Sequence, residues 1–297
     1  MKGKKFRKRL ESIRNIRKHE LQDKAFEYLG LFCTLLGVLV LATLLLDVLI
    51  DGLGRINWDF LFTGTSRKAA WAGIYTAWVG TLWIMVLTSL IAFPLGIGAG
   101  LYLEEYGTRG RLSNFIEINI ANLAGVPSII YGLLGLELFA RAFALGNSVL
   151  TGALTLSLLI LPIIIVSTRE ALKSVPYTIR EASYGLGATK WQTIWFQVLP
   201  ASISGIITGA ILSISRAIGE TAPLLVVGAL AYISFTPKGP MDSFTVLPIL
   251  IFDWISRPQP GFATNAAAAI IILLFITFLM NGIAVFFRHR AQKKIKW

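Results

Sequence analysis

Long runs of apolar residues dominate the hydrophobic pattern of this chain. A helix rises about 1.5 Å per residue, so roughly 20 apolar residues cross the ~30 Å hydrocarbon core of a membrane. The pattern predicts an all-α, polytopic membrane protein with six transmembrane helices, approximately Glu27–Ile50, Ile74–Leu103, Phe115–Ala140, Val149–Leu172, Ala201–Ala229 and Phe262–Phe287.

Composition and charge strengthen this prediction and orient it. Hydrophobic residues make up 55% of the chain, charged residues 15%, and the mean hydropathy is +0.68. Of the 28 Lys and Arg residues, 21 lie in alternate segments between the predicted helices, including both ends of the chain. By the positive-inside rule we expect both termini in the cytoplasm, which requires an even number of spans.

The net charge of +12 has two interpretations, nucleic-acid binding or membrane topology. No basic platform with interleaved aromatic residues is present, so we expect no nucleic-acid partner and take lipid headgroups as the counter-charge. The predicted organisation is a basic cytoplasmic tail (1–26), a first transmembrane anchor (27–50), a five-helix core (72–290) and a short tail (291–297). The basic segment is too long for a signal peptide, so we expect the anchor to be retained.

Proline and glycine interrupt several predicted spans. In the second, Pro94 predicts a bend, while Gly96 and Gly100 permit close helix contact. In the third, Gly125 and Pro127 loosen the helix near its middle. Irregular backbone at membrane depth is tolerated where it is buried in protein or lines a cavity, so this span is expected to face the interior.

Two pairs of opposite charges lie within or beside these spans. Glu137 and Arg141 are four residues apart and can pair on one helix face, as an ion pair at the outer mouth or as part of ligand passage. Arg216 and Glu220 in the fifth span have the same spacing. Because a charge inside a membrane is costly, they are expected to face the bundle interior.

Arg216 and Glu220 allow two interpretations. They could be a neutralised structural pair that fixes helix register. Alternatively, Arg216 meets an oxyanion in the substrate pathway, because a guanidinium offers a planar fork to such groups and stays charged at cellular pH. In that case Glu220 holds Arg216 in place and limits how tightly the anion binds.

The segment 173–200 is too polar to span a membrane and is cytoplasmic by the charge count. We expect a short surface helix broken at Gly185 and Gly187, with Arg180 and Glu181 on its polar face. A cytoplasmic loop with this much predicted structure is expected to meet another protein.

The same segment resembles the EAA loop of ABC-importer membrane subunits. The resemblance rests on Glu181 and Ala182, on Gly187 and on the Leu199–Pro200 pair, with Ser183 in place of the usual third-position Ala and Gln197 in place of Ile. It implies a coupling loop that docks on an ATPase subunit.

A longer stretch, 72–290, is similar to the A-type permease subunit of the phosphate-specific ABC importer. The similar segments include GVPSIIYGLLGLELF, LPASISGIITGAILSISRAIGETAPLLVVG and PILIFDWISRPQ. The resemblance implies a cell-membrane complex in which the chain pairs with a second permease as a heterodimer, with two ATPase subunits and an extracytoplasmic phosphate-binding protein. It also implies inward movement of inorganic phosphate by alternating access.

The outer loop 231–261 contains the apolar segment FTVLPILIFDWI. We expect this segment to lie on the membrane or against a partner, either as a cap over the pathway or as a docking surface for the binding protein. Asn281 in the last span is expected to make an interhelical hydrogen bond.

Other classes of function are disfavoured by what the sequence lacks. There is no GxxxxGK[ST] motif, so ATP and Mg are expected on the partner ATPase, and this chain is expected to bind no cofactor. We find neither zinc-ligand spacing nor a Ser, His and Asp set, and predict no metal site and no catalytic residues. A channel or secondary transporter leaves the cytoplasmic loop unexplained, and no internal repeat is evident. Phosphate, another oxyanion and a role as the sister phosphate permease remain open from the residues alone.

Overall fold

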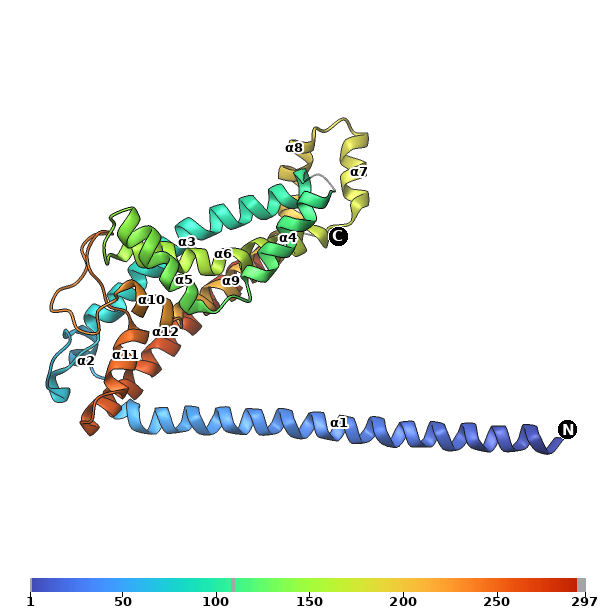
Figure 1. Cartoon of the computed structure of the whole chain (residues 1–297), viewed down its shortest axis with the longest axis horizontal. Coiled ribbons are helices and arrows are strands. Elements are labelled where there is room, and N and C mark those ends of the chain that lie inside the picture. Colours follow the sequence, from blue (N-terminus) through green and yellow to red (C-terminus); the bar gives the residue numbers. More distant parts are fainter. Residues whose placement is uncertain (1, 108–109, 293–297) are drawn as a thin grey trace. The chain divides into compact units, whose positions relative to one another are not determined.

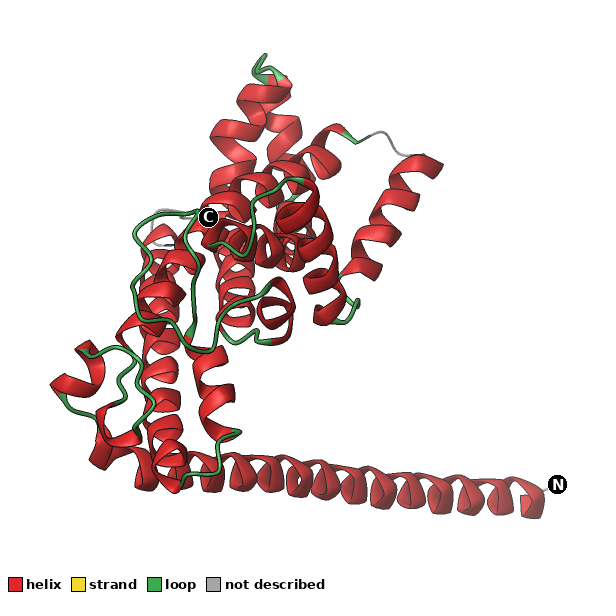
Figure 2. Ribbon diagram, turned by 60° about the vertical axis from the view of Figure 1, so that its left-hand side comes forward, coloured by secondary structure: helices red, strands yellow, loops and turns green. Residues whose placement is uncertain are grey.

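The computed structural model describes residues 2–107 and 110–292, and every regular element within those ranges is helical (Figure 2). The chain divides into two compact units, Met1–Asp51 and Gly52–Trp297. The first is formed by α1 (Lys2–Gly52), so the predicted tail and anchor lie on one continuous helix. Of the tail predicted at 291–297, residues 293–297 lie outside the described part of the chain.

The second unit is a helical bundle with short connecting helices (Figure 1). Its long helices are α3 (Tyr75–Leu101), α6 (Val149–Lys173), α9 (Leu199–Ile218) and α12 (Pro260–Gln292). The shorter elements are η1 (Leu53–Arg55), α2 (Trp58–Phe62), η2 (Ala69–Trp71), η3 (Tyr102–Tyr106), α4 (Arg111–Leu123), α5 (Ser128–Gly135), η4 (Leu136–Ala142), α7 (Tyr177–Gly185), α8 (Lys190–Thr193), η5 (Ile194–Val198), α10 (Ala222–Val227) and α11 (Leu247–Ile255).

Among the described residues, five helices are long and apolar enough to cross a membrane. A sixth crossing is made if α4 and α5–η4 are counted as one span, although the two parts meet at a bend of 101°. The predicted number of six spans agrees with this count. The third span was predicted as a loosened helix, but it is broken completely between Leu123 and Ser128.

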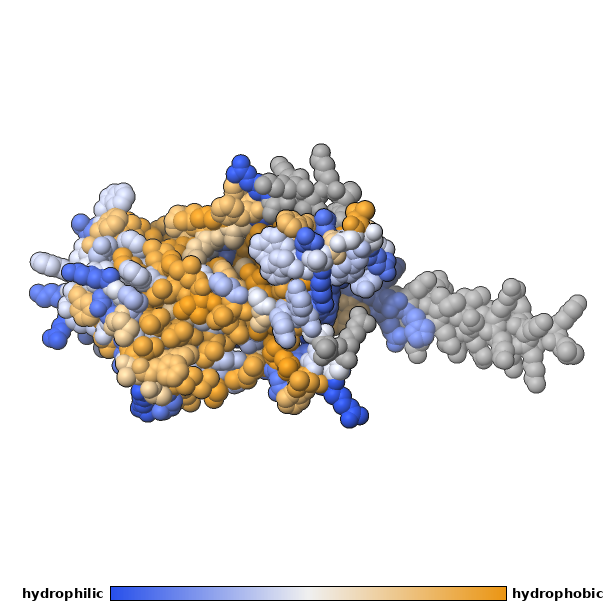
Figure 3. All heavy atoms as spheres, turned by 90° about the horizontal axis from the view of Figure 1, so that it is seen from above, coloured by the Kyte–Doolittle hydropathy of each residue, from blue (hydrophilic) through white to orange (hydrophobic). Residues whose placement is uncertain are grey.

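Close packing of α3 on α6 forms the centre of the bundle. A Cβ atom at Gly96 would lie 2.6 Å from Ile164 Cγ2, and one at Gly100 would lie 2.8 Å from Thr168 Cβ. These contacts confirm that Gly96 and Gly100 permit close helix contact. Outside this core the surface is strongly apolar, and Figure 3 shows on one face a broad hydrophobic area bordered by hydrophilic residues. Such a surface suits lipid or a neighbouring membrane subunit.

The apolar segment of the outer loop occupies a different place from the one predicted. It forms α11, whose apolar side chains are mostly buried within the unit, with Trp254 only 1% exposed. Helix α11 packs against α12 and α3. The prediction that this segment lies on the membrane or on a partner is therefore wrong for most of its side chains, because the chain's own helices cover them.

Candidate translocation site and coupling loop

The predicted fifth span is interrupted beside its charged residues. Helix α9 ends at Ile218, Gly219 caps it, and a new short helix, α10, begins at Ala222. The span therefore does not run as one helix to Ala229, as the hydrophobic pattern indicated. Glu220 lies in the interruption itself, while Arg216 lies in the last turn of α9.

Arg216 and Glu220 lie close enough to interact, as their spacing predicts. Arg216 Nε is 3.4 Å from Glu220 Oε1, and the side chains are 40% and 17% exposed, respectively. Within the described residues, Glu220 is the only hydrogen-bond partner of the Arg216 side chain, and the bond uses Nε alone. The two terminal nitrogens of the guanidinium are therefore left able to donate to another oxygen-bearing group.

The two interrupted spans pack against each other. A Cβ atom at Gly132 of α5 would lie 2.7 Å from Pro223 Cα of α10, so only glycine permits this approach. The bend before α5 is closed by Tyr131, whose hydroxyl donates to the carbonyl of Leu123 at 2.8 Å. The non-helical backbone of both spans is thus found in one part of the bundle.

Glu137 and Arg141 form the predicted ion pair on η4. Their side chains are 63% and 64% exposed, so the pair is accessible from outside the chain. An exposed pair of this kind contributes little to stability, about 0.2–1 kcal/mol. Its place at the mouth or in ligand passage stays a prediction.

The predicted loop 173–200 contains a helix, a turn and a second helix. It begins with α7, which carries Glu181 and Ala182 on its exposed surface, and turns at Gly187 into α8. Gly187 has φ +83°, a conformation that side-chain-bearing residues rarely adopt. The predicted break at Gly185 and Gly187 is confirmed. Leu199 and Pro200 follow η5 without a break, so Pro200 lies within the continuous helix Lys190–Ile218, directly after its π-helical turn.

Ser183 explains one departure from the EAA pattern. Its hydroxyl lies 2.8 Å from the hydroxyl of Thr193, which is fully buried on α8. This hydrogen bond joins the two arms of the loop, and an alanine at 183 could not make it. The next residue, Tyr184, is partly covered, and burial together with the nearby Glu105 carboxylate raises the pKa of its phenol. The shift only extends the pH range in which the Tyr184 phenol is neutral and can donate a hydrogen bond.

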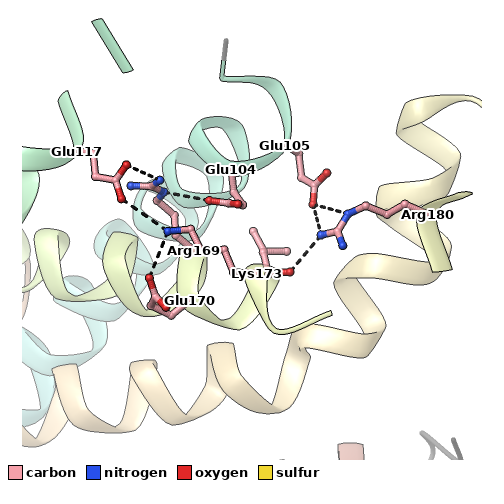
Figure 4. A network of polar contacts seen from close by, with 8 residues as sticks. Glu104, Glu105, Glu117, Arg169, Glu170, Lys173 and Arg180 are labelled. Atoms are coloured by element: carbon pink, nitrogen blue, oxygen red, sulfur yellow. Dashed lines mark hydrogen bonds and ion pairs between the residues drawn. The ribbon is translucent and has the colours of Figure 1, made fainter. Parts of the chain in front are cut away.

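Arg180 is the clearest difference from the sequence prediction. It was expected on a polar, solvated face, but its side chain is only 10% exposed and lies 2.7 Å from Glu105, which is 7% exposed (Figure 4). Two backbone carbonyls, those of Leu172 and Val175, also accept from its guanidinium, at 3.1 and 2.8 Å. A helical wheel treats α7 alone and cannot anticipate a carboxylate supplied by η3.

A second ion cluster adjoins this pair. Arg169, near the end of α6, lies 3.4 Å from Glu104 of η3 and 2.9 Å from Glu117 of α4. Lys173 lies 3.6 Å from Glu117 and 3.4 Å from Glu170. The sequence analysis counted Arg169 and Lys173 only as positive charge on the cytoplasmic side and assigned no role to the three glutamates. One signal in the sequence could have indicated these ion pairs. Glu104 and Glu105 lie at the cytoplasmic end predicted for the second span, and Arg169 and Lys173 lie at the same end of the fourth.

Comparison with known proteins agrees with this architecture. Residues 92–293 match the family model described as "Binding-protein-dependent transport system inner membrane component". The chain is 37% identical over 240 residues to the phosphate transport system permease protein PstA of Mycobacterium leprae, covering 80% of this chain and 77% of that protein. It is 31% identical over 264 residues to PstA of Haemophilus influenzae, covering 88% of this chain and 92% of that protein.

It is also similar to the probable ABC transporter permease protein YqgI of Bacillus subtilis, with 34% identity over 224 residues, 74% of this chain and 76% of that protein. Among solved structures, a bacterial alginate ABC transporter has a chain that superposes with a TM-score of 0.65 at 15% identity, over 89% of this chain and 94% of that one. A chain of the MetNI methionine ABC transporter superposes with a TM-score of 0.57 at 17% identity, over 71% and 93%. These two likenesses support the fold alone.

The resemblance found in the loop and the core sequence is confirmed by these matches. Members of the matched family are membrane components of transport systems rather than enzymes. The chain belongs to the binding-protein-dependent transport system inner membrane component family and is a multi-span permease subunit of an ABC transporter.

Proposed function

We propose that this chain is one of two permease subunits of an ATP-driven importer that moves inorganic phosphate into the cell. The observation that carries the proposal is Arg216, held 3.4 Å from Glu220 at the interruption between α9 and α10. Discontinuous helices recur at the substrate sites of membrane transporters. An arginine with free terminal nitrogens at such a place suits a tetrahedral oxyanion.

The pairing with Glu220 also suits release. A carboxylate 3.4 Å from the guanidinium offsets part of its charge, so the anion is attracted without being trapped. An importer needs this balance, because its cargo must leave the site in each cycle. The PstA proteins to which the chain is similar are named for phosphate transport, which supports phosphate over other oxyanions.

The remaining parts follow from this assignment. The α7–α8 loop faces the cytoplasm together with both termini and docks on one of two ATPase subunits, which bind ATP and Mg. The second permease completes the pathway as a heterodimer, and an extracytoplasmic phosphate-binding protein delivers the cargo. ATP binding moves the loop, and the bundle alternates between outward-open and inward-open states.

The experiment is uptake of radiolabelled phosphate into proteoliposomes that hold the whole complex, with ATP inside and the binding protein outside. Phosphate uptake should depend on ATP and should resist a large excess of sulfate or molybdate. Uptake of sulfate or molybdate in place of phosphate supports the alternative, a permease for another oxyanion. Phosphate uptake that needs no ATP would instead indicate a secondary transporter or channel.

A further inference from the structure

We propose that Glu105 and Arg180 form a strut that carries movement of the coupling helix α7 directly to the transmembrane helix α3. This inference rests on the proposed function, since it assigns the route by which the conformational change of the ATPase subunit reaches the transmembrane helices. Arg180 is a positioning residue here: it touches neither ATP nor the cargo. The geometry around it sets it apart from an ordinary surface ion pair.

The guanidinium of Arg180 joins three elements at once. Its Nη2 and Nε donate to Glu105 Oε1 of η3 at 2.7 and 3.3 Å. Its Nη2 also donates to the carbonyl of Leu172 in the last turn of α6, and its Nη1 donates to the carbonyl of Val175 just beyond that helix. A cation at the C-terminal end of a helix is also stabilised by the helix dipole. Arg180 itself belongs to α7, so its position fixes α7 relative to both η3 and α6.

Glu105 lies on a direct continuation of a transmembrane helix. Element η3 follows α3 without a break, and its π-helical turn is closed by the bond from Gly107 N to Tyr102 O at 2.9 Å. A pull on Glu105 therefore acts on the end of α3, which is the helix in most extensive contact with α6. Glu104 provides a second connection from η3. It pairs with Arg169 of α6, which also pairs with Glu117 of α4 (Figure 4).

Apart from the hydrogen bond between Ser183 and Thr193, which joins α7 to α8 and so to α9, the other contacts of α7 are less directional. Its covalent link to α6 is the short segment Ser174–Pro176, which leads only to α6. Ile179 of α7 packs on an apolar cluster around Leu172, Val175 and Val198. Apolar contacts resist separation but allow sliding, whereas several hydrogen bonds from one planar group fix direction as well as distance. The strut is therefore the contact best suited to transmit rotation of α7 to η3 and α3.

The test measures phosphate transported per ATP hydrolysed by the reconstituted complex. Glu105→Gln and Arg180→Gln should each lower this ratio by about fivefold or more, within the 5- to 150-fold range of typical coupling. Stimulation of ATP hydrolysis by the binding protein should fall as well, because the signal from the binding protein must cross the same contact to reach the ATPase subunit, while unstimulated hydrolysis continues. Glu170→Gln, which removes an exposed carboxylate one turn before Ser174, is the matched control and should leave both readouts unchanged.

A double variant separates transmission from simple stability. Removing one partner leaves a buried charge unpaired, but replacing both by apolar residues often preserves folding. Glu105→Leu with Arg180→Met should therefore assemble with the ATPase subunits, yet retain the low transport ratio. A wild-type ratio in this double variant, or in Glu105→Gln, overturns the strut. If the wild-type complex moves no phosphate, the proposed function fails, and the strut is judged by binding-protein stimulation of hydrolysis.

Discussion

Replacing Gly132 by alanine adds one carbon atom where α5 meets α10. The new Cβ would lie 2.7 Å from Pro223 Cα, 3.0 Å from Pro223 O and 3.0 Å from Val226 Cβ. Carbon atoms in favourable contact are about 3.5–4.0 Å apart, so the helices must separate by roughly 1 Å. Two of the three atoms belong to the backbone of a buried proline, and no side-chain rotation can relieve the clash.

The size of the effect follows from two opposing contributions. Overpacking of this kind costs about 1–3 kcal/mol. Replacing glycine by alanine in a helix gains up to about 1 kcal/mol. Gly98→Ala supplies the matched control, because Gly98 lies in α3 with no atom within 4 Å of the added Cβ. The difference between the two variants is then the steric cost alone, about 1–3 kcal/mol.

The assay is the apparent melting temperature of the purified complex, together with phosphate uptake. In domains of 150–250 residues 1 kcal/mol corresponds to about 2–4 °C, and in larger ones to less, so Gly132→Ala should melt measurably below Gly98→Ala. Uptake should fall as well, because α10 begins two residues after Glu220. Equal melting temperatures for the two variants would refute the close α5–α10 packing.

Two further predictions concern Gly187 in the α7–α8 loop and Arg55 in η1. Gly187→Asp should uncouple hydrolysis from transport, because it puts a charged side chain at a φ of +83° in the turn of the loop; hydrolysis that still responds to the binding protein, with the ATPase still co-purifying, contradicts this role. Arg55→Gln should lower stability by about 1.5–3 kcal/mol, because the guanidinium donates to Asn265 and to the carbonyls of Ala70 and Ala72. An unchanged melting temperature contradicts this.

Much of the fold follows from the length of the apolar runs. This is a strong signal because a bilayer forces helices of about 20 residues. The breaks in the third and fifth spans were less predictable. Pro127 and Gly219 permit an interruption, but the 101° bend is accompanied by a bond across the break, from Tyr131 to the Leu123 carbonyl, and by packing of Gly132 on Pro223 of another span. The pattern of one helix does not contain those contacts.

The candidate site shows the same division between local and long-range information. The distance from Arg216 to Glu220 and the hydrogen bond from Ser215 Oγ to Asn281 Oδ1, 2.8 Å long, agree with the predictions. The four-residue spacing was enough to predict the contact between Arg216 and Glu220. A lone amide in an apolar span was enough to predict the interhelical hydrogen bond of Asn281. Arg180 and Glu105 lie 75 positions apart, and their meeting depends on how η3, α6 and α7 fold together.

The most direct test of the account is ATP-driven phosphate uptake by a complex carrying Arg216→Gln. Glutamine keeps hydrogen-bonding groups but removes the charge, and the loss of charge-assisted bonds predicts a decrease in uptake of about tenfold or more. Arg257→Gln, which removes another arginine with a partner four residues away, is the control and should retain uptake. Undiminished uptake by a fully assembled Arg216→Gln complex would contradict the proposal that this arginine meets the anion.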